Sequence, residues 1–317
     1  MIREILLWML VIVGVLPLVN LIIGVHPPRF STDDGPGRYG LRYEPVSFRT
    51  SDGLTLRGWF IPAARTASGV KKQPAGCATV LVGHGYPFDK ANILGHAVFL
   101  HEEFNLLVMD FRYFGESEGA YTTVGIHEKR DVTAAVTYVK TRREVDPTRI
   151  GAMGFSLSAA TFILARHPEV KAIVADSPYA SLEQVIARQF FIFPGPTKWP
   201  LVALTRLYAK VLLGIDVREA APAEAVRQLK VPLFLIHGGA DSQIPAAHSR
   251  QIAANADPVT TELWVVPHAD HGHAHALEEH QYETRVRQFF RRHLCVDAGP
   301  AAPTGLSDRL DATRPGR

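Results

Sequence analysis

The sequence has very little cysteine. Cys77 and Cys295 are the only two in 317 residues. Two such distant cysteines make no disulfide framework, no CxxC redox motif and no cysteine-ligated zinc site. The fold therefore has to depend on a hydrophobic core, and a chain of this length with 47% hydrophobic residues can form one.

The sequence also lacks a basic cluster and, in its body, a low-complexity tract. Lys and Arg number 34 against 31 Asp and Glu, a formal charge of +3 that is spread along the chain. Nucleic-acid binding normally needs a concentrated basic surface, so we expect no nucleic-acid partner. Ordinary globular composition excludes a disordered or fibrous protein.

One long apolar run is present near the N-terminus. Ile5 to Val25 is a stretch of 21 residues without a charge, dominated by Leu, Ile and Val. About 20 apolar residues let a helix cross a bilayer, so the sequence predicts a single transmembrane anchor over residues 1–25. A cleaved signal peptide is the alternative, but its apolar part is shorter and ends in small residues. More arginines follow the run than precede it, which favours a cytoplasmic catalytic domain.

The rest of the chain predicts one domain with flexible flanks. Residues 26–42 form a Pro/Gly/Asp-rich linker, and residues 297–317 form a Gly/Pro/Ala-rich tail with too little apolar content to pack. The domain itself spans 43–296. It opens with two strand-like runs, Val46–Thr50 and Leu54–Ile61, whose connecting turn signal predicts a hairpin.

Beyond the hairpin, short apolar runs alternate with helical stretches. The candidate strands are Ala78–Val82, Asn105–Met109, Arg149–Met153, Ala172–Ala175, Pro232–Ile236 and Glu262–Val266. A helix predicted over Ile126–Arg143 carries one apolar stripe, formed by Val132, Ala135, Val136 and Val139. Apolar strands separated by amphipathic helices predict an α/β fold in which helices cover both faces of a mostly parallel sheet.

One interval interrupts this alternation. Residues 178–230 are too long for a simple connection between a strand and a helix, and they contain two helical patterns on either side of Phe193-Pro194-Gly195-Pro196. We interpret the interval as a helical cap insertion. Its large apolar residues, Phe190, Phe191 and Phe193 among them, either pack onto the main domain or form the wall of a lipophilic pocket or a lid that faces a membrane.

A nucleophile motif lies between a predicted strand and a predicted helix. The segment Gly154-Phe155-Ser156-Leu157-Ser158 matches the G-x-S-x-G elbow, except that Ser158 replaces the usual glycine. Small residues two positions before and after the serine prevent collisions across this sharp turn. A helix N-cap serine would also suit this position. We predict that Ser156 is a catalytic nucleophile.

A serine nucleophile needs an imidazole to take its proton and a carboxylate to orient the imidazole, in the chain order Ser, acid, His for this kind of elbow. Asp241 follows a predicted strand 85 residues after Ser156, and His271 follows the next strand 30 residues later. We therefore predict the triad Ser156, Asp241 and His271. His268 and His273 are alternative bases. Asp110 and Asp176 also end strands, where a structural role is favoured.

Taken together, four stretches resemble the α/β-hydrolase superfamily: His84-Gly85-Tyr86, Asp110-Phe111-Arg112-Tyr113-Phe114-Gly115-Glu116-Ser117, the Ser156 elbow, and the pair Asp241 and His271. The resemblance covers roughly Tyr43 to Leu294 and is greatest to membrane-anchored serine hydrolases of the monoglyceride-lipase and serine-aminopeptidase type. It implies an oxyanion hole formed by the backbone N–H groups of Tyr86 and Leu157. It also implies that Arg112 and Gly115 shape the adjacent loop.

Two other classes of function deserve comparison. A metal hydrolase is suggested by a run of histidines, namely His268, His271, His273, His275 and His280. That spacing suits metal ligands only on an extended strand, and no H-E-x-x-H motif accompanies it. A non-catalytic membrane scaffold is the other alternative, but it has no physical reason to retain a complete set of nucleophile, acid, base and oxyanion loop.

The sequence therefore predicts a membrane-anchored serine hydrolase, an esterase or lipase without cofactor or metal. Its expected substrates are carboxylic esters, and lipophilic acyl esters are favoured by the apolar cap and anchor. Peptidase and thioesterase activity remain open because amides and thioesters pass through the same tetrahedral intermediate.

Overall fold

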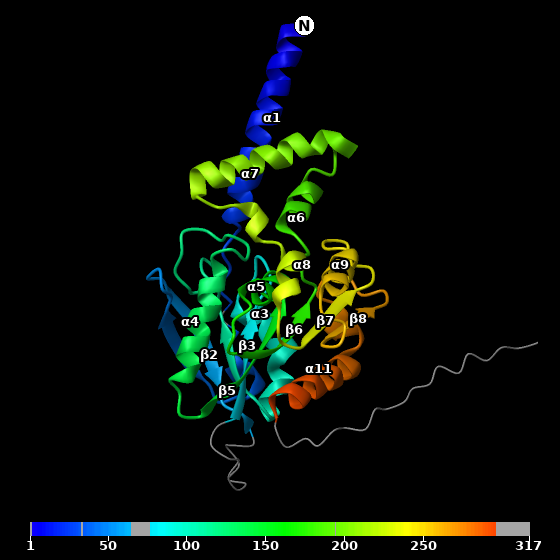
Figure 1. The fold of residues 1–317 in the computed structure, drawn as a ribbon. Coiled ribbons are helices and arrows are strands. Elements are labelled where there is room, and N and C mark those ends of the chain that lie inside the picture. The colour runs from blue at the N-terminus through cyan, green and yellow to red at the C-terminus, as the bar shows by residue number, and fades with distance from the viewer. Residues whose placement is uncertain (1, 33, 65–76, 194, 296–317) are drawn as a thin grey trace, which may run out of the picture.

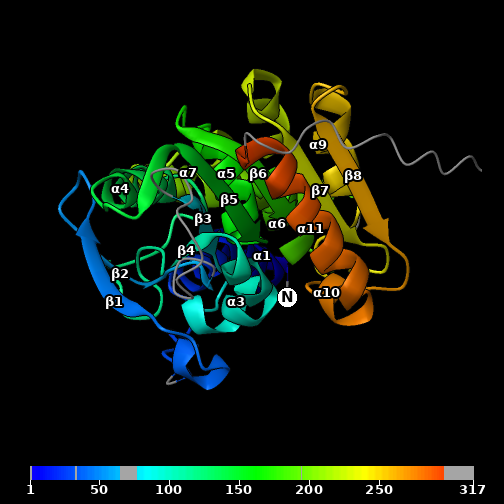
Figure 2. The same cartoon turned by 90° about the horizontal axis from the view of Figure 1, so that it is seen from below.

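The computed structural model describes residues 2–32, 34–64, 77–193 and 195–295, so the predicted tail over 297–317 lies outside the described residues. The described chain forms an eight-stranded sheet with helices on both faces (Figures 1 and 2). The strands are β1 (Glu44–Arg49), β2 (Thr55–Ile61), β3 (Cys77–Gly83), β4 (Asn105–Met109), β5 (Val145–Phe155), β6 (Val170–Asp176), β7 (Leu233–Gly238) and β8 (Thr261–Val266).

The strand order is β1-β2-β4-β3-β5-β6-β7-β8. The hairpin strands β1 and β2 are antiparallel, as is the pair β2 and β4, while every later pair is parallel. This arrangement confirms the predicted α/β-hydrolase fold with its mostly parallel sheet.

The described chain also contains ten helices and five short 3-10 turns. The helices are α1 (Ile2–Val25), α3 (Lys90–Ala97), α4 (Glu128–Lys140), α5 (Leu157–Ala165), α6 (Leu182–Gln189), α7 (Trp199–Leu213), α8 (Pro222–Ala225), α9 (Ala247–Asn255), α10 (Ala274–Leu277) and α11 (Glu279–Leu294). The 3-10 turns are η1 (Pro36–Tyr39), η2 (Val98–Glu102), η3 (Gly195–Lys198), η4 (Val217–Glu219) and η5 (Val226–Gln228).

The core lies in two layers because successive strand residues point to opposite faces of the sheet. Leu81 packs in the layer that also contains apolar residues of α4, α5 and α9. Its neighbours Val80 and Val82 pack in the layer that contains residues of α3 and α11. The predicted apolar stripe of α4 is buried in the first layer, as its spacing requires.

The cap interval contains the two expected helices, α6 and α7, between β6 and β7. Phe190 is buried with Ala187, Leu201 and Val202, so the two helices share a small core of their own. Figure 1 shows α7 lying across α1, on the side of the sheet from which α1 projects.

The predicted transmembrane anchor is not supported. The apolar run does form a helix, α1, but within the described residues no helix meets the length and apolarity needed to cross a membrane. The C-terminal half of α1 packs on the domain instead. Leu21 and Val25 are buried in the cluster that includes residues of α7, and Leu16 packs against the cap core. Tyr208 on α7 donates a hydrogen bond to the Gly14 carbonyl at 3.0 Å.

The segment predicted as a linker, 26–42, contacts the domain. The Arg29 guanidinium donates to the Gly115 carbonyl at 2.7 Å, and the Tyr113 hydroxyl donates to the Pro27 carbonyl at 2.7 Å. These bonds hold the end of α1 next to the loop that follows β4.

Because Leu16, Leu21 and Val25 of α1 pack on the domain, two truncations should differ in stability. Removing residues 1–25 should lower the free energy of unfolding by several kcal/mol, since each buried Leu or Val side chain contributes about 1.5–3 kcal/mol. Removing residues 1–11, which leaves these three side chains in place, should lower it less. Thermal and urea unfolding of the two truncated proteins would check this, and equal stability would show that the docked half of α1 contributes nothing.

Candidate active site

Ser156 lies on a strained turn between β5 and α5. Its φ of 52° and ψ of −105° are unusual for a residue with a side chain and push the hydroxyl out of the turn. Gly154 is required here, because a Cβ at this position would lie 2.5 Å from the Ala159 nitrogen. Ser158 is tolerated in place of glycine because it faces Gly83, where a Cβ would lie 2.5 Å from the Ser158 Cβ. The Ser158 hydroxyl also accepts a hydrogen bond from the Phe155 N–H at 2.9 Å.

The structure brings Ser156, His271 and Asp241 into one hydrogen-bonded chain. His271 Nε2 is 3.0 Å from the Ser156 hydroxyl, and His271 Nδ1 is 2.7 Å from Asp241 Oδ2. A carboxylate beside Nδ1 keeps the proton on that nitrogen, which leaves Nε2 free to accept the serine proton. The three side chains come from loops that follow β5, β7 and β8, at the carboxyl edge of the sheet where sites in such folds assemble.

Asp241 is held in its charged form. Burial by itself would raise the pKa of this carboxyl group, but hydrogen bonds from His237, His271 and the Ile244 N–H together lower it well below its usual range. Its Oδ1 accepts the backbone N–H groups of Gln243 at 3.0 Å and Ile244 at 2.7 Å. Asp241 is therefore ionised at neutral pH, as an acid that orients an imidazole must be.

The alternative bases and acids lie elsewhere. His268, His273 and His280 are exposed, and His275 pairs with Glu283.

The two alternative acids have other partners. Asp110 accepts hydrogen bonds from the backbone and side chain of Lys90, and Asp176 accepts from Ser177 and Tyr282. Asp110 is thus connected to the start of α3, and Asp176 to α11.

The loop of the predicted oxyanion residue Tyr86 is fixed by His84. The buried His84 ring donates from Nδ1 to the Gly85 carbonyl at 2.8 Å and accepts the Phe111 N–H at Nε2, 3.1 Å away. Burial lowers the pKa of His84, which keeps the ring neutral as these two bonds require. Gly85 allows the loop to approach the elbow, because a Cβ there would lie 2.5 Å from the Phe155 ring.

The other predicted oxyanion residue, Leu157, is the first residue of α5, where a backbone N–H has no acceptor within the helix. Tyr86, Leu157, Ser156 and His271 all line one cavity. The Tyr86 hydroxyl lies 3.3 Å from the Gly24 carbonyl of α1, and burial raises the pKa of Tyr86 to about 12. Tyr86 thus remains protonated at physiological pH and can donate that bond.

Arg112 and Gly115 shape the loop after β4, as the resemblance implies. Arg112 is buried and forms ion pairs with Asp52 at 2.8 Å and Asp131 at 2.7 Å. Gly115 has a φ of 50°, and a Cβ at this position would collide with the Asp110 carboxyl group. Neither residue lines the cavity that contains Ser156.

His237 is a fully buried residue of β7 for which no role was predicted from the sequence. Its Nε2 donates to the Ile244 carbonyl at 2.6 Å and lies 3.3 Å from Asp241 Oδ2, the oxygen that also faces His271. Its Nδ1 is 2.7 Å from the Ser249 hydroxyl. His237 and His271 therefore both contact the same carboxylate oxygen. The sequence did contain a signal for this role, because His237 lies directly after a predicted strand, four residues before the predicted acid.

The cavity above Ser156 has a volume of about 710 Å³. Its walls come from the cap, through Val185, Ile186 and Phe191, and from α1, through Asn20 and Ile23. The contribution of α1 was not foreseen, since that segment was predicted to lie in a membrane. None of the described residues that line the cavity is acidic.

Replacing His237 with Phe, which has no hydrogen-bond donor, should slow the reaction of Ser156 with a fluorophosphonate probe about tenfold to hundredfold. A hydrogen bond to a charged group contributes about 1.5–3 kcal/mol, and each 1.4 kcal/mol corresponds to about tenfold in rate. The exposed His273→Phe variant is the matched control, and equal rates for the two variants would remove His237 from the site.

Comparison with known proteins identifies the family. Residues 116–296, more than half of the chain, match the model of the prolyl oligopeptidase family. The uncharacterized protein Rv2307c of Mycobacterium tuberculosis is 31% identical over 247 residues, which are 77% of this chain and 78% of that protein. The thiohydrolase apmlB of Arthrinium phaeospermum is 37% identical over 142 residues, which are 43% of each chain.

A solved structure agrees with this assignment. The esterase Pf2001 of Pyrococcus furiosus superposes with a TM-score of 0.67 and 28% sequence identity, covering 85% of this chain and 98% of that one. The family match, the fold and the elbow lead to one conclusion: this chain is an α/β-hydrolase that belongs to the prolyl oligopeptidase family.

Proposed function

We propose that the protein is a serine hydrolase that cleaves carboxylic esters with lipophilic acyl chains. The observation that carries the proposal is the continuous chain from the Ser156 hydroxyl through His271 to Asp241, with distances of 3.0 Å and 2.7 Å, at the base of a large cavity. In this proposal Ser156 is the nucleophile, His271 the general base and Asp241 the residue that orients the imidazole.

The reaction follows from this geometry. Ser156 attacks the ester carbonyl while its proton moves to His271 Nε2, and the backbone N–H groups of Tyr86 and Leu157 stabilise the negative oxygen of the tetrahedral intermediate. The imidazolium then donates its proton to the departing alkoxide, which leaves as an alcohol. Water attacks the acyl-enzyme while His271 accepts its proton. The bond to Ser156 then breaks, His271 returns the proton to the Ser156 oxygen, and the carboxylic acid is released.

The walls of the cavity favour an acyl chain over a peptide. Val185, Ile186 and Ile23 offer apolar surface, and the volume lies within the range typical of small-molecule sites. Recognition of a substrate amine would need a carboxylate, which the described lining does not contain. Similarity to the esterase Pf2001 supports this choice of substrate class. Similarity to the thiohydrolase apmlB makes thioesters the second candidate.

Replacing Ser156 with Ala should abolish both fluorophosphonate labelling and hydrolysis of p-nitrophenyl esters, with a loss of several orders of magnitude in kcat, since the nucleophile supplies most of the rate of a triad enzyme. Circular dichroism and the melting temperature should show that the fold is retained. Persistent labelling of the variant at another serine would contradict the assignment.

Two neighbouring phenylalanines of the cap should have different effects. The Phe191 side chain is 81% exposed and lines the cavity, so Phe191→Ala should raise KM for long acyl esters and barely change KM for acetyl esters. Each buried methylene contributes about 0.8 kcal/mol. Phe190 is 2% exposed in the core of the cap, so Phe190→Ala should lower the stability by about 3–5 kcal/mol.

A chain-length series of esters, measured together with melting temperatures, separates these two effects. If Phe191→Ala reduces activity equally for every chain length, the cavity does not hold the acyl chain. The case for lipophilic esters would then be lost even if the triad is correct.

A further inference from the structure

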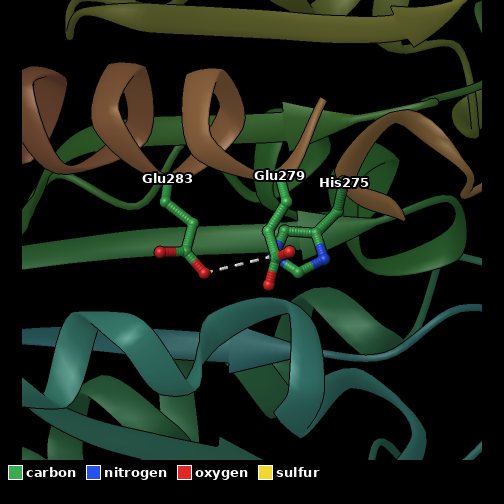
Figure 3. Close-up of side chains that lie close together, drawn as sticks. All are labelled: His275, Glu279 and Glu283. Atoms are coloured by element: carbon green, nitrogen blue, oxygen red, sulfur yellow. Dashed lines mark hydrogen bonds and ion pairs between the residues drawn. The ribbon is translucent and has the colours of Figure 1, made fainter. Parts of the chain in front are cut away.

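Three side chains that can bind a metal ion converge on one face of α10 and α11, outside the cavity (Figure 3). Glu279 and Glu283 are four residues apart on α11, which places them above one another on successive helical turns. His275 comes from the neighbouring short helix α10. One nitrogen of His275 and one oxygen of each carboxylate all lie within 4.8 Å of one another. His275 Nε2 is 3.4 Å from the nearer Glu283 oxygen.

The imidazole of this cluster is held in place by aromatic rings. The Phe99 ring stacks on His275 with a centroid distance of 6.4 Å, and the Tyr282 ring meets it edge-on at 5.1 Å. The His96 ring lies on a third side, with a centroid distance of 5.2 Å. Only 14% of the His275 side chain is exposed. Its orientation toward Glu283 is therefore fixed by packing, which is what a preorganised ligand requires.

Within the described part of the chain, neither carboxylate pairs with a lysine or arginine, and Glu283 pairs with His275. Like charges four residues apart on a helix repel each other. A cation bound between them would remove this repulsion.

We propose that His275, Glu279 and Glu283 bind a divalent transition-metal ion such as Zn²⁺, with water completing the coordination. Zinc binds both imidazole nitrogen and carboxylate oxygen, whereas Mg²⁺ and Ca²⁺ prefer oxygen ligands alone. Zinc-to-ligand distances of about 2.0–2.2 Å require the donors to draw closer than they now lie. Rotation of the exposed Glu279 side chain can provide this approach.

The bound ion would brace the catalytic loop without taking part in the chemistry. It would join α10, which begins three residues after His271, to α11. On α11, the Tyr282 hydroxyl donates to Asp176 at 2.9 Å, and the Asp176 carbonyl accepts the Ser156 N–H at 2.8 Å. The ion would thus strengthen the connection between the loop of His271 and the elbow of Ser156.

Calorimetric titration of the full-length protein with Zn²⁺, together with metal analysis after dialysis, tests the proposal. We expect one ion per chain, a melting temperature raised by several degrees, and no comparable effect of Mg²⁺. Substituted Co²⁺ should show the visible absorption of a tetrahedral site. His275→Gln and Glu283→Gln should each weaken binding at least tenfold. Glu278→Gln and His273→Gln, which alter exposed neighbours outside the cluster, should bind as the unmodified protein does.

The test is independent of the proposed hydrolase activity. The Ser156→Ala variant should bind Zn²⁺ with unchanged stoichiometry and affinity, even if ester hydrolysis proves to be the wrong reaction. Absence of stoichiometric binding would overturn the proposal. So would equal binding by the unmodified protein and the Glu283→Gln variant, because the ion would then lie at other histidines. Glu283 is partly exposed, so this second variant remains informative if His275→Gln does not fold.

Discussion

The tight turn at Ser156 is the constraint on which the rest of the site depends. Its strained backbone is stable only if neighbouring segments come close enough to hold it, and they do so around Phe155. Gly85 on one side and Gly272 on the other allow two loops to approach the Phe155 ring, which a Cβ at either position would strike at 2.5 Å and 2.8 Å. The loop of His84 and the loop of His271 thus meet the same ring, and the elbow sets the position of both.

A buried polar network stabilises the charged carboxylate of Asp241. Asp241 lies in a region where an isolated carboxylate would be costly, and burial alone would raise its pKa. Two histidines and two backbone N–H groups offset that cost. His237 is in turn paired with Ser249, so the support of Asp241 extends into α9. Such networks are rigid only when every member is satisfied, which connects the geometry of the site to the packing of the domain.

Apolar residues of the cap and of α1 together line the cavity that contains Ser156. Cap residues such as Ile186 and Phe191 face residues of α1 such as Ile23 across the same space. Helix α7 crosses α1, and Leu21 and Val25 of α1 are buried in a cluster with Ala209 of α7 (Figure 1). The N-terminal segment is therefore part of the wall of the site as well as part of the fold. This explains why so many apolar residues of the cap and of α1 lie together.

Local patterns in the sequence were enough to predict the sheet, the elbow and the order of Ser156, Asp241 and His271, because strand periodicity and the sharp turn depend on residues near in the chain. They were not enough to predict the docking of α1. An uncharged apolar run can bury its surface against lipid or against another apolar helix, and the contact of α1 with α7 depends on where α7 lies in the fold. The support of Asp241 by His237, the different environments of Phe190 and Phe191, and the convergence of His275 with Glu283 likewise depend on burial and on distances between segments, which only the tertiary structure determines.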